Sequence, residues 1–262
     1  MPEGFDGADP LALDYTPEGT TTALIAIVAP RGGGKTTLMA ALAPHLGPRD
    51  RLTIVSPVNV IGKKLGLRVE TRYGADKDNE AYFSKLLSGR RVVLIMDEFD
   101  EFCPSSVQSK FGGYCCDALY RLVNYARNEP WCIGMLVSFR GASDVTTNLL
   151  RAATVLFIGR TQEPNALDYF SRYLGREYGG MLRNLPNFVF VVWADGRLRG
   201  YIRVDGGEVL WVNPPPGWPT PDSALSAGDG LPSTAGSAPP TESDPTPGTS
   251  ATPASESSVP TP

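Results

Sequence analysis

The sequence predicts an α/β fold with a mostly parallel central sheet and helices on both faces. Short apolar runs alternate with segments of helical periodicity through the middle of the chain, and this alternation is typical of parallel strands joined by helical crossovers. The β-rich segment from Asn187 to Val212 instead contains the turn pairs Asp195-Gly196 and Gly206-Gly207, which favour antiparallel hairpins. We therefore expect a C-terminal antiparallel hairpin or meander at the edge of the sheet.

The parallel part of the fold is predicted element by element from these runs. The expected strands are continuous apolar runs, as in sheets whose strands are buried on both faces. They cover residues 23–29, 52–56, 91–96, 132–138 and 154–159. Helices are expected between and after these runs, near residues 35–46, 78–88, 115–128, 143–151 and 164–174.

The composition divides the chain into three parts. Residues 1–19 form a polar lead-in, and residues 20–213 hold all the expected strands and helices. Residues 214–262 contain 13 of the 24 prolines, five acids and no Lys or Arg. Such a segment cannot bury enough apolar surface to offset its ordering entropy, so we predict a disordered, acidic, Pro/Ser/Thr-rich tail.

Charge, cysteine usage and hydropathy exclude several classes of protein. The formal net charge is −4, and because the tail is acidic, residues 1–213 are near neutral. Any contact with nucleic acid must then come from local patches. The four cysteines show no Cys-x-x-Cys spacing and His45 is the single histidine, so no zinc site is expected. No signal peptide and no apolar run approaching 18 residues is present, and we expect a cytoplasmic protein without a transmembrane segment.

The segment APRGGGKTTL, residues 29–38, has the composition of a phosphate-binding loop. Glycines allow backbone N–H groups to converge on a phosphate, and they adopt positive φ at little cost. The segment also stands between an expected strand and an expected helix, as this motif requires. Lys35 is expected to reach the β- and γ-phosphates of ATP, and the Thr36 hydroxyl to bind Mg²⁺. The predicted ATP-binding residues are Pro30, Arg31, Gly32, Gly33, Gly34, Lys35, Thr36 and Thr37.

Two acids follow the third expected strand, in VVLIMDE. They lie at the carboxyl end of a buried strand, where ligands of open α/β sheets bind. Asp97 is expected to hold Mg²⁺ through its water shell, and Glu98 to polarise the water that attacks the γ-phosphate. Together with the phosphate loop, the pair forms Walker A and Walker B motifs. Asp100 and Glu101, which follow, are interpreted as a solvated face.

These residues resemble the FtsK/HerA branch of P-loop motor ATPases, which includes the small genome-packaging ATPases of membrane-containing icosahedral viruses. The resemblance extends from residue 22 to about residue 175. It rests on APRGGGKTT, VVLIMDEFDEF, YAR, SFRGASDV and FIGRTQEPNALDYFSRYLG. It implies a RecA-like P-loop NTPase core within the predicted α/β fold, and the use of ATP and Mg²⁺.

The resemblance also implies three further catalytic residues. An arginine after Walker B reaches the ATP site of the neighbouring subunit in this family, and Arg127 matches that position; Arg151 and Arg160 are alternatives. Ser138 matches the polar sensor at a strand end. Arg140 matches the family's arginine, but Phe139 stands where the family has Gln, and this leaves the sensor open.

The partners follow from the same resemblance. Such an arginine, called an arginine finger, is supplied by a neighbouring subunit and therefore requires a homo-oligomer. In this family the homo-oligomer is usually a hexameric ring with DNA in its pore. The candidate DNA contacts are Lys63, Lys64 and Arg68, which together with Arg72 form the most basic stretch of the chain; a solvated loop is the equal alternative. Capsid or virion membrane proteins are further partners, with virion association at the packaging vertex.

Three functions remain open on the sequence. The first is an ATP-driven translocase that packages double-stranded viral DNA into a capsid. The second is a Zot-like ATPase that drives assembly of filamentous virions. The third is a regulatory ATPase that acts without DNA, although Glu98 argues against a module that only binds nucleotide.

Overall fold

The computed structural model describes residues 23–88, 92–103, 113–125, 132–142, 147–194 and 196–220. The chain divides into two units, Met1–Ala227 and Gly228–Pro262, and all described residues belong to the first. The polar lead-in and most of the predicted tail therefore lie outside the described residues.

Residues 214–220 pack on the domain, beyond the predicted boundary at residue 213. Trp218 makes an edge contact with the Tyr201 ring, and the Tyr201 hydroxyl donates to the Pro219 carbonyl over 2.9 Å.

The described strands form one nine-stranded sheet with the order β3-β2-β4-β5-β1-β6-β7-β8-β9. Strands β3 to β6 in this order pair in parallel, and β7, β8 and β9 pair antiparallel at the β6 side. The strands are β1 Ala23–Val28, β2 Leu52–Ser56, β3 Val69–Thr71, β4 Val92–Met96, β5 Cys132–Phe139, β6 Val155–Gly159, β7 Val189–Ala194, β8 Arg197–Asp205 and β9 Glu208–Val212. This confirms the mostly parallel sheet and the antiparallel C-terminal meander.

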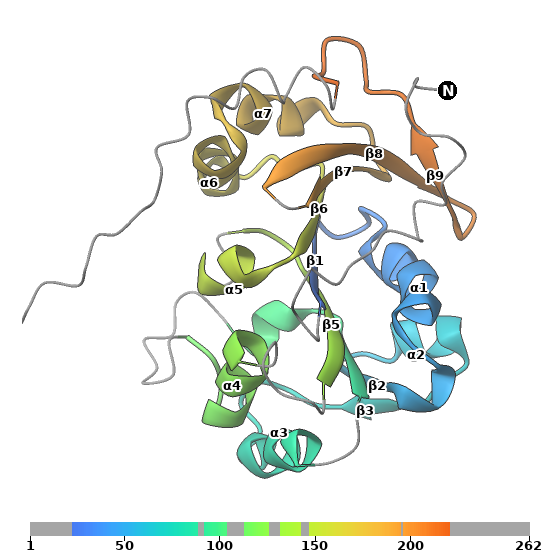
Figure 1. Ribbon diagram of the computed structural model, residues 1–262, viewed down its shortest axis with the longest axis vertical. Helices are drawn as coiled ribbons and strands as arrows, with labels where there is room; N and C mark the ends of the chain where they lie inside the picture. The colour runs from blue at the N-terminus through green and yellow to red at the C-terminus, as the bar shows by residue number, and fades with distance from the viewer. Residues whose placement is uncertain are drawn as a thin grey trace, which may run out of the picture. The chain divides into compact units, whose positions relative to one another are not determined.

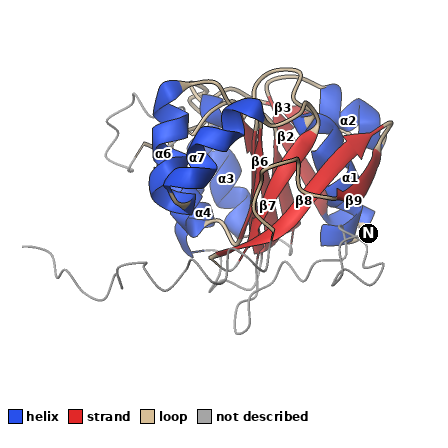
Figure 2. Ribbon diagram, turned by 90° about the horizontal axis from the view of Figure 1, so that it is seen from above, coloured by secondary structure: helices blue, strands red, loops and turns tan. Residues whose placement is uncertain are grey.

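Helices cover both faces of the sheet, as Figures 1 and 2 show. Helices α1 and α2 lie on one face, and α3, α4, α5, α6 and α7 lie on the other. Their bounds are α1 Lys35–Leu46, α2 Val60–Leu65, α3 Asn79–Leu87, α4 Asp117–Tyr125, α5 Thr147–Ala152, α6 Pro164–Leu174 and α7 Arg176–Met181. The sequence explains some of these ends. Helix α6 begins with a proline at its first position and is followed by Gly175 at φ 106°.

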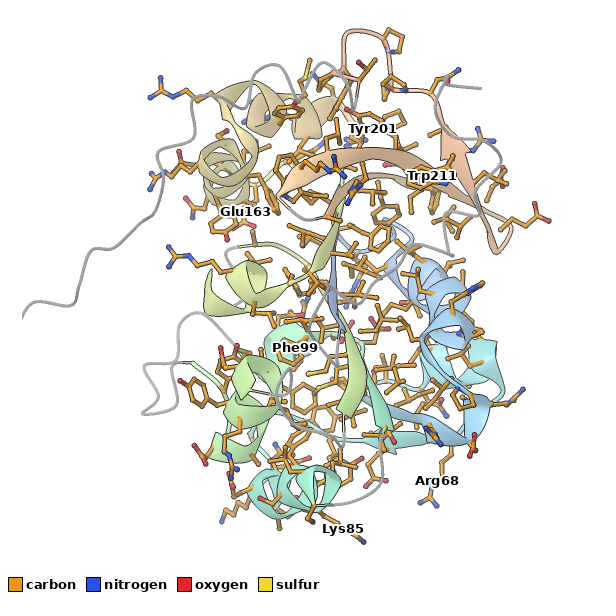
Figure 3. The ribbon with its side chains drawn as sticks, viewed as in Figure 1. Arg68, Lys85, Phe99, Glu163, Tyr201 and Trp211 are labelled. Atoms are coloured by element: carbon orange, nitrogen blue, oxygen red, sulfur yellow. The ribbon has the colours of Figure 1, made fainter. Side chains whose placement is uncertain are left out.

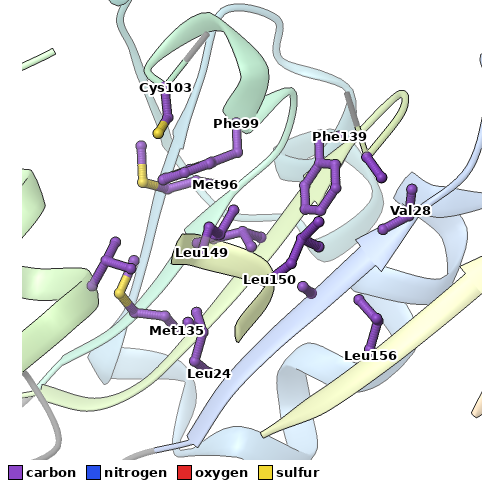
Figure 4. Close-up of a cluster of buried hydrophobic side chains, with 14 of the residues drawn as sticks. Leu24, Val28, Met96, Phe99, Cys103, Met135, Phe139, Leu149, Leu150 and Leu156 are labelled. Carbon is purple, nitrogen blue, oxygen red and sulfur yellow. The ribbon is translucent and has the colours of Figure 1, made fainter. Parts of the chain in front are cut away.

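Strand β1 separates two hydrophobic clusters. Successive side chains of a strand point to opposite faces, so Ile25 and Ile27 pack with α1 whereas Leu24 and Val28 pack with α5 and β6. Figure 4 shows the cluster that contains Leu24 and Val28. Here the side chains of Leu149 and Leu150, on α5, pack against β1 and β5. Strand β1 and its neighbours are thus buried on both faces, and their carboxyl ends are where a ligand can reach them.

The structure adds two α-helices, α2 and α7, and one strand, β3, that the sequence pattern did not predict. Helix α2 changes the description of the basic stretch, because Lys63 and Lys64 lie in this helix rather than in a loop. Arg68 follows the helix in the connection to β3. The remaining expected strands and helices in the described ranges are present. Most of their ends differ from the expected ends by a few residues.

Candidate functional site

The phosphate loop connects β1 to α1 and needs each of its three glycines. Gly32 and Gly34 have φ of 78° and 92°, a region that side chains with a Cβ rarely adopt. At Gly33, a Cβ would lie 2.9 Å from the Ala29 Cβ and 3.0 Å from the Pro30 carbonyl oxygen. The loop is closed by a hydrogen bond from the Gly33 N–H to that same carbonyl, over 3.0 Å. This tight arch leads into the N-terminus of α1, which favours an anion.

Lys35, at the start of α1, lies beneath the loop. Its Nζ donates to the carbonyl oxygens of Ala29, over 2.6 Å, and Pro30, over 3.2 Å. Burial lowers the pKa of the Lys35 ammonium below its ordinary 10.5, and the nearby carboxylates, with Asp97 first, oppose that shift. Burial thus disfavours the charged form of this ammonium, and the negative charge of a polyphosphate would stabilise it.

Asp97 is the centre of a buried hydrogen-bond network at the end of β4. Its Oδ2 accepts from the Thr36 hydroxyl over 3.0 Å, and its Oδ1 accepts from the Ser138 hydroxyl and, over 3.2 Å, from the Glu98 N–H. The Asp97 residue is 2% exposed, and Ser138 is fully buried. The network brings together α1, β4 and β5, three elements that the sequence predicted to meet here. Hydroxyl and carboxylate oxygens are the ligands Mg²⁺ prefers, so Thr36 and Asp97 fit that ion.

Glu98 has a left-handed backbone, with φ 57° and ψ 50°. This conformation is uncommon for a residue other than glycine and often marks a functional position. The turn separates Glu98 from Asp97: the Asp97 carboxylate faces Thr36 and Ser138, whereas Glu98 lines the pocket at the phosphate loop. The two acids of the predicted Walker B motif are therefore divided between a buried network and an open pocket wall.

Arg140 follows β5 and forms ion pairs with two acids. Its Nε lies 2.9 Å from Asp100 Oδ2, and its Nη2 lies 3.4 Å from Glu101 Oε1. These acids, Asp100 first, raise the pKa of the Arg140 guanidinium. The Asp100 side chain is only 9% exposed, so the interpretation of Asp100 as a solvated face is wrong. The pairs hold Arg140 at the pocket wall.

Phe139 lies outside the pocket. Its side chain is fully buried in the hydrophobic cluster with Val28 and Leu150, as Figure 4 shows, because it points to the opposite face of β5 from Ser138. Only its backbone reaches the phosphate loop, where its carbonyl accepts from the Ala29 N–H over 3.3 Å. Phe139, where the resemblance to FtsK/HerA ATPases leads one to expect Gln, therefore belongs to the core and not to the pocket lining.

These residues surround a pocket of about 250 Å³ at the carboxyl ends of the strands. Predicted site residues form most of the lining. The lining residues are Arg31, Gly32, Gly34, Lys35, Thr36, Thr37, Glu98, Arg140 and Phe188. Phe188 is the lining residue that the sequence did not predict. It directly precedes β7, and no sequence motif marks that position.

The other predicted residues do not line this pocket. Lys63, Lys64 and Arg68 are exposed on and after α2, and Figure 3 shows Arg68 pointing away from the body of the molecule. Arg151 is exposed on α5, and Arg160 reaches Asn187 Oδ1 from 3.4 Å. Arg127 lies outside the described residues. Within the described part of the chain, no helix is long and apolar enough to cross a membrane.

Comparisons with known proteins agree with this geometry. A model of the ATPase family associated with various cellular activities (AAA) matches residues 25–176. Comparison with curated protein sequences found no match.

Among solved structures, the chain is similar to the DNA-packaging ATPase B204 from Sulfolobus turreted icosahedral virus. The two are 18% identical, the match covers 74% of this chain and 98% of that chain, and the TM-score is 0.52. B204 from Sulfolobus turreted icosahedral virus 2, a genome-packaging NTPase solved with sulfate, is 18% identical, with 74% and 98% covered and a TM-score of 0.54. The same protein with AMP is 17% identical, with 68% and 96% covered and a TM-score of 0.54. These similarities confirm the expected P-loop ATPase fold.

Proposed function

Since the chain belongs to the AAA family of ATPases and is itself an ATPase, we propose that it hydrolyses ATP to translocate double-stranded DNA and thereby packages a viral genome into a capsid. One observation carries the packaging role: the domain shares its fold with nearly the whole length of a viral DNA-packaging ATPase. The hydrolytic role is supported by the pocket, where the Glu98 carboxylate, the buried Lys35 and the phosphate loop converge.

ATP binding begins at the phosphate loop in this proposal. The backbone N–H groups between Gly32 and Lys35 take the β-phosphate, and the Lys35 ammonium exchanges its two carbonyl partners for phosphate oxygens. The remaining loop residues, Pro30, Arg31, Thr36 and Thr37, bind around the same phosphates. A bound Mg²⁺, held by Thr36 and through water by Asp97, would neutralise charge on the phosphates.

Hydrolysis follows at the side of the pocket that Glu98 lines. The Glu98 carboxylate accepts a proton from a water molecule whose oxygen attacks the γ-phosphorus, and the bond to the ADP oxygen breaks. Ser138 keeps this wall in position, because its hydroxyl bonds Asp97 and also lies 3.4 Å from the Glu98 N–H. Arg140 supplies positive charge at the same wall and compensates the charge of the transition state.

The arginine finger makes the active unit an oligomer. We propose that Arg127 of a neighbouring subunit completes the site and that the assembly is a ring, most simply a hexamer. Subunits with Arg127→Ala keep Lys35, and subunits with Lys35→Ala keep Arg127, so mixing the two inactive variants should rebuild complete sites. Recovered hydrolysis in the mixed assembly supports the finger in trans, and mixed rings without activity contradict it.

DNA contact is assigned to the basic patch, defined as Lys63, Lys64 and Arg68. All three side chains are exposed, and phosphate contacts of this kind are salt-sensitive rather than sequence-specific. Replacing Lys63 and Lys64 with alanine should lower the slope of log affinity against log salt by about 2, one for each lost contact. The control is the double variant Lys77→Ala/Lys85→Ala, which removes the same charge near α3 (Figure 3 labels Lys85) and should leave the slope unchanged.

The deciding experiment compares steady-state ATP hydrolysis with and without long duplex DNA. Glu98→Gln serves as the blank, because it should bind ATP but hydrolyse it poorly. Strong stimulation by duplex DNA supports a translocase, and the capsid and virion membrane proteins then become the partners to test. Hydrolysis that is indifferent to DNA would instead favour the Zot-like assembly ATPase or the regulatory ATPase.

A further inference from the structure

An aromatic ring forms part of the pocket wall without a role in the proposed hydrolysis. Phe188 lines the pocket and is 47% exposed. Its Cδ1 lies 3.0 Å from the point that a Cβ of residue 34 would occupy, so the ring rests against the phosphate loop at Gly34. A phenylalanine gains much by burial, and one left open in a ligand pocket has a face available for a planar group.

The backbone at Phe188 is held in an unfavourable conformation. Its φ is 63°, a value that costs a β-substituted residue free energy and that occurs at functional positions. The surroundings hold this conformation in place, because the Phe188 carbonyl accepts from the Val204 N–H over 2.9 Å and the Val189 N–H donates to the Pro186 carbonyl over 3.2 Å. These two backbone hydrogen bonds fix the position from which the ring reaches the pocket.

The order of strands places the proposed hydrolytic residues and Phe188 on opposite sides of β1. On one side of β1 lie β5 and β4, which carry Ser138, Arg140 and Glu98 at their ends. On the other side lie β6 and β7, and Phe188 directly precedes β7 (Figure 1). A triphosphate whose γ-phosphate faces Glu98 can therefore extend its nucleoside away from β4 and β5, toward the Phe188 ring that lines the same pocket.

We propose that Phe188 stacks on the base of the bound nucleoside triphosphate and so positions ATP for hydrolysis. The inference rests on the orientation of the triphosphate given under the proposed function. Stacking on an aromatic face is available to every base, so Phe188 contributes affinity and orientation rather than a choice between bases. Phe188 is a binding residue for the nucleotide and takes no part in proton transfer.

Calorimetric titrations with ATP and with inorganic tripolyphosphate separate the base from the phosphates. In the Glu98→Gln background, where hydrolysis is suppressed, Phe188→Ala should raise the Kd for ATP by about 5- to 150-fold, the equivalent of one lost base stack. The Kd for tripolyphosphate should stay within about twofold, because that ligand has no base. Phe188→Tyr, which keeps an aromatic face, should bind ATP as the parent does.

Two control variants test whether a loss of ATP affinity comes from destabilised folding or from the loss of any exposed aromatic side chain. Phe188→Gly relieves the left-handed conformation, so it should fold at least as stably as the parent while it loses ATP affinity as Phe188→Ala does. Tyr73→Ala removes another half-exposed aromatic side chain that is outside the pocket lining, and should leave ATP binding unchanged.

The outcomes are distinguishable. Unchanged ATP affinity in both Phe188→Ala and Phe188→Gly would overturn the proposal. So would an equal loss of ATP and tripolyphosphate binding, because the ring would then support the phosphate loop and not the base. Lys35→Ala tests the phosphate site separately: it should abolish binding of both ligands, and if it does not, the orientation of the triphosphate fails, whatever Phe188 does.

Discussion

The Thr36 hydroxyl donates a hydrogen bond to the Asp97 carboxylate over 3.0 Å, across 61 residues of sequence. This contact joins the start of α1 to the end of β4, and the Ser138 hydroxyl joins β5 to the same carboxylate. The phosphate loop and the Walker B acids thus form one connected polar unit. A change at the phosphates can reach two strands of the sheet through this single carboxylate.

Asp97→Asn tests the proposed metal role of this unit. The amide can still accept from Ser138, so we expect little loss of thermal stability. Its lost charge should weaken the hold on metal-bound water and reduce hydrolysis by about 10- to 100-fold. The measurement is the ATPase rate against Mg²⁺ concentration, where the half-saturating concentration should rise. Asp168→Asn, at an exposed carboxylate paired with Arg172, is the matched control; an unchanged Mg²⁺ dependence for Asp97→Asn would contradict the metal role.

Phe139→Gln introduces the residue that the resemblance to FtsK/HerA ATPases would place here, and it should destabilise the protein. Position 139 faces the hydrophobic cluster, so the substitution removes packing and buries an amide among apolar side chains. We expect the free energy of unfolding to fall by about 2–4 kcal/mol, with no gain in hydrolysis. Urea denaturation measures the loss, and Leu210→Gln on exposed β9 should cost little by comparison. A stable variant with faster hydrolysis would show that residue 139 does reach the pocket.

Lys35 should make stability depend on pH at the alkaline side. Burial lowers its pKa in the folded chain, so between that lowered pKa and 10.5 the unfolded chain binds the extra proton. The free energy of unfolding of the nucleotide-free protein should therefore rise with pH through this window. Chemical denaturation at a series of pH values measures the slope. Lys35→Met has no proton to lose, and the difference between the two profiles isolates Lys35; identical profiles would contradict the shift.

Arg140 should have separable structural and catalytic effects. Arg140→Ala leaves the poorly exposed Asp100 carboxylate without its cation, and we expect a loss of about 1–2 kcal/mol in the free energy of unfolding. The double variant Arg140→Ala/Asp100→Ala removes both charges and should regain much of that stability. Hydrolysis should stay low in both variants, because neither has a cation at the pocket wall. Recovery of hydrolysis in the double variant would make Arg140 purely structural.

The sequence predicted best those elements that have strong local signals. The first helix, Lys35–Leu46, and the second strand, Leu52–Ser56, agree with the expected bounds, since glycines and apolar runs delimit them. Helix α2, strand β3 and helix α7 were missed because six or three residues are too few to reveal a period. Their existence depends on packing against the sheet, and local propensity does not report that.

The site residues also divide into those that a sequence motif marks and those that only the fold brings to the site. Walker motifs identify Lys35, Thr36 and Asp97 because each requires a residue type at a fixed spacing, and the structure brings all three together. Phe188 has no such spacing, and only the order of strands brings it to the phosphate loop. The pairing of Arg140 with Asp100 was hidden for the same reason, since 40 residues separate them.

The two ends of the sheet limit how copies of this domain can associate. An outer strand offers unpaired N–H and C=O groups, and long exposed ones recruit further chains into aggregates. Here β3 is three residues long, and β9 is followed at once by Asn213 and the prolines 214–216, which have no N–H to donate. Neither border favours extension of the sheet by backbone pairing. A contact between copies of this domain would therefore use side chains rather than added backbone hydrogen bonds.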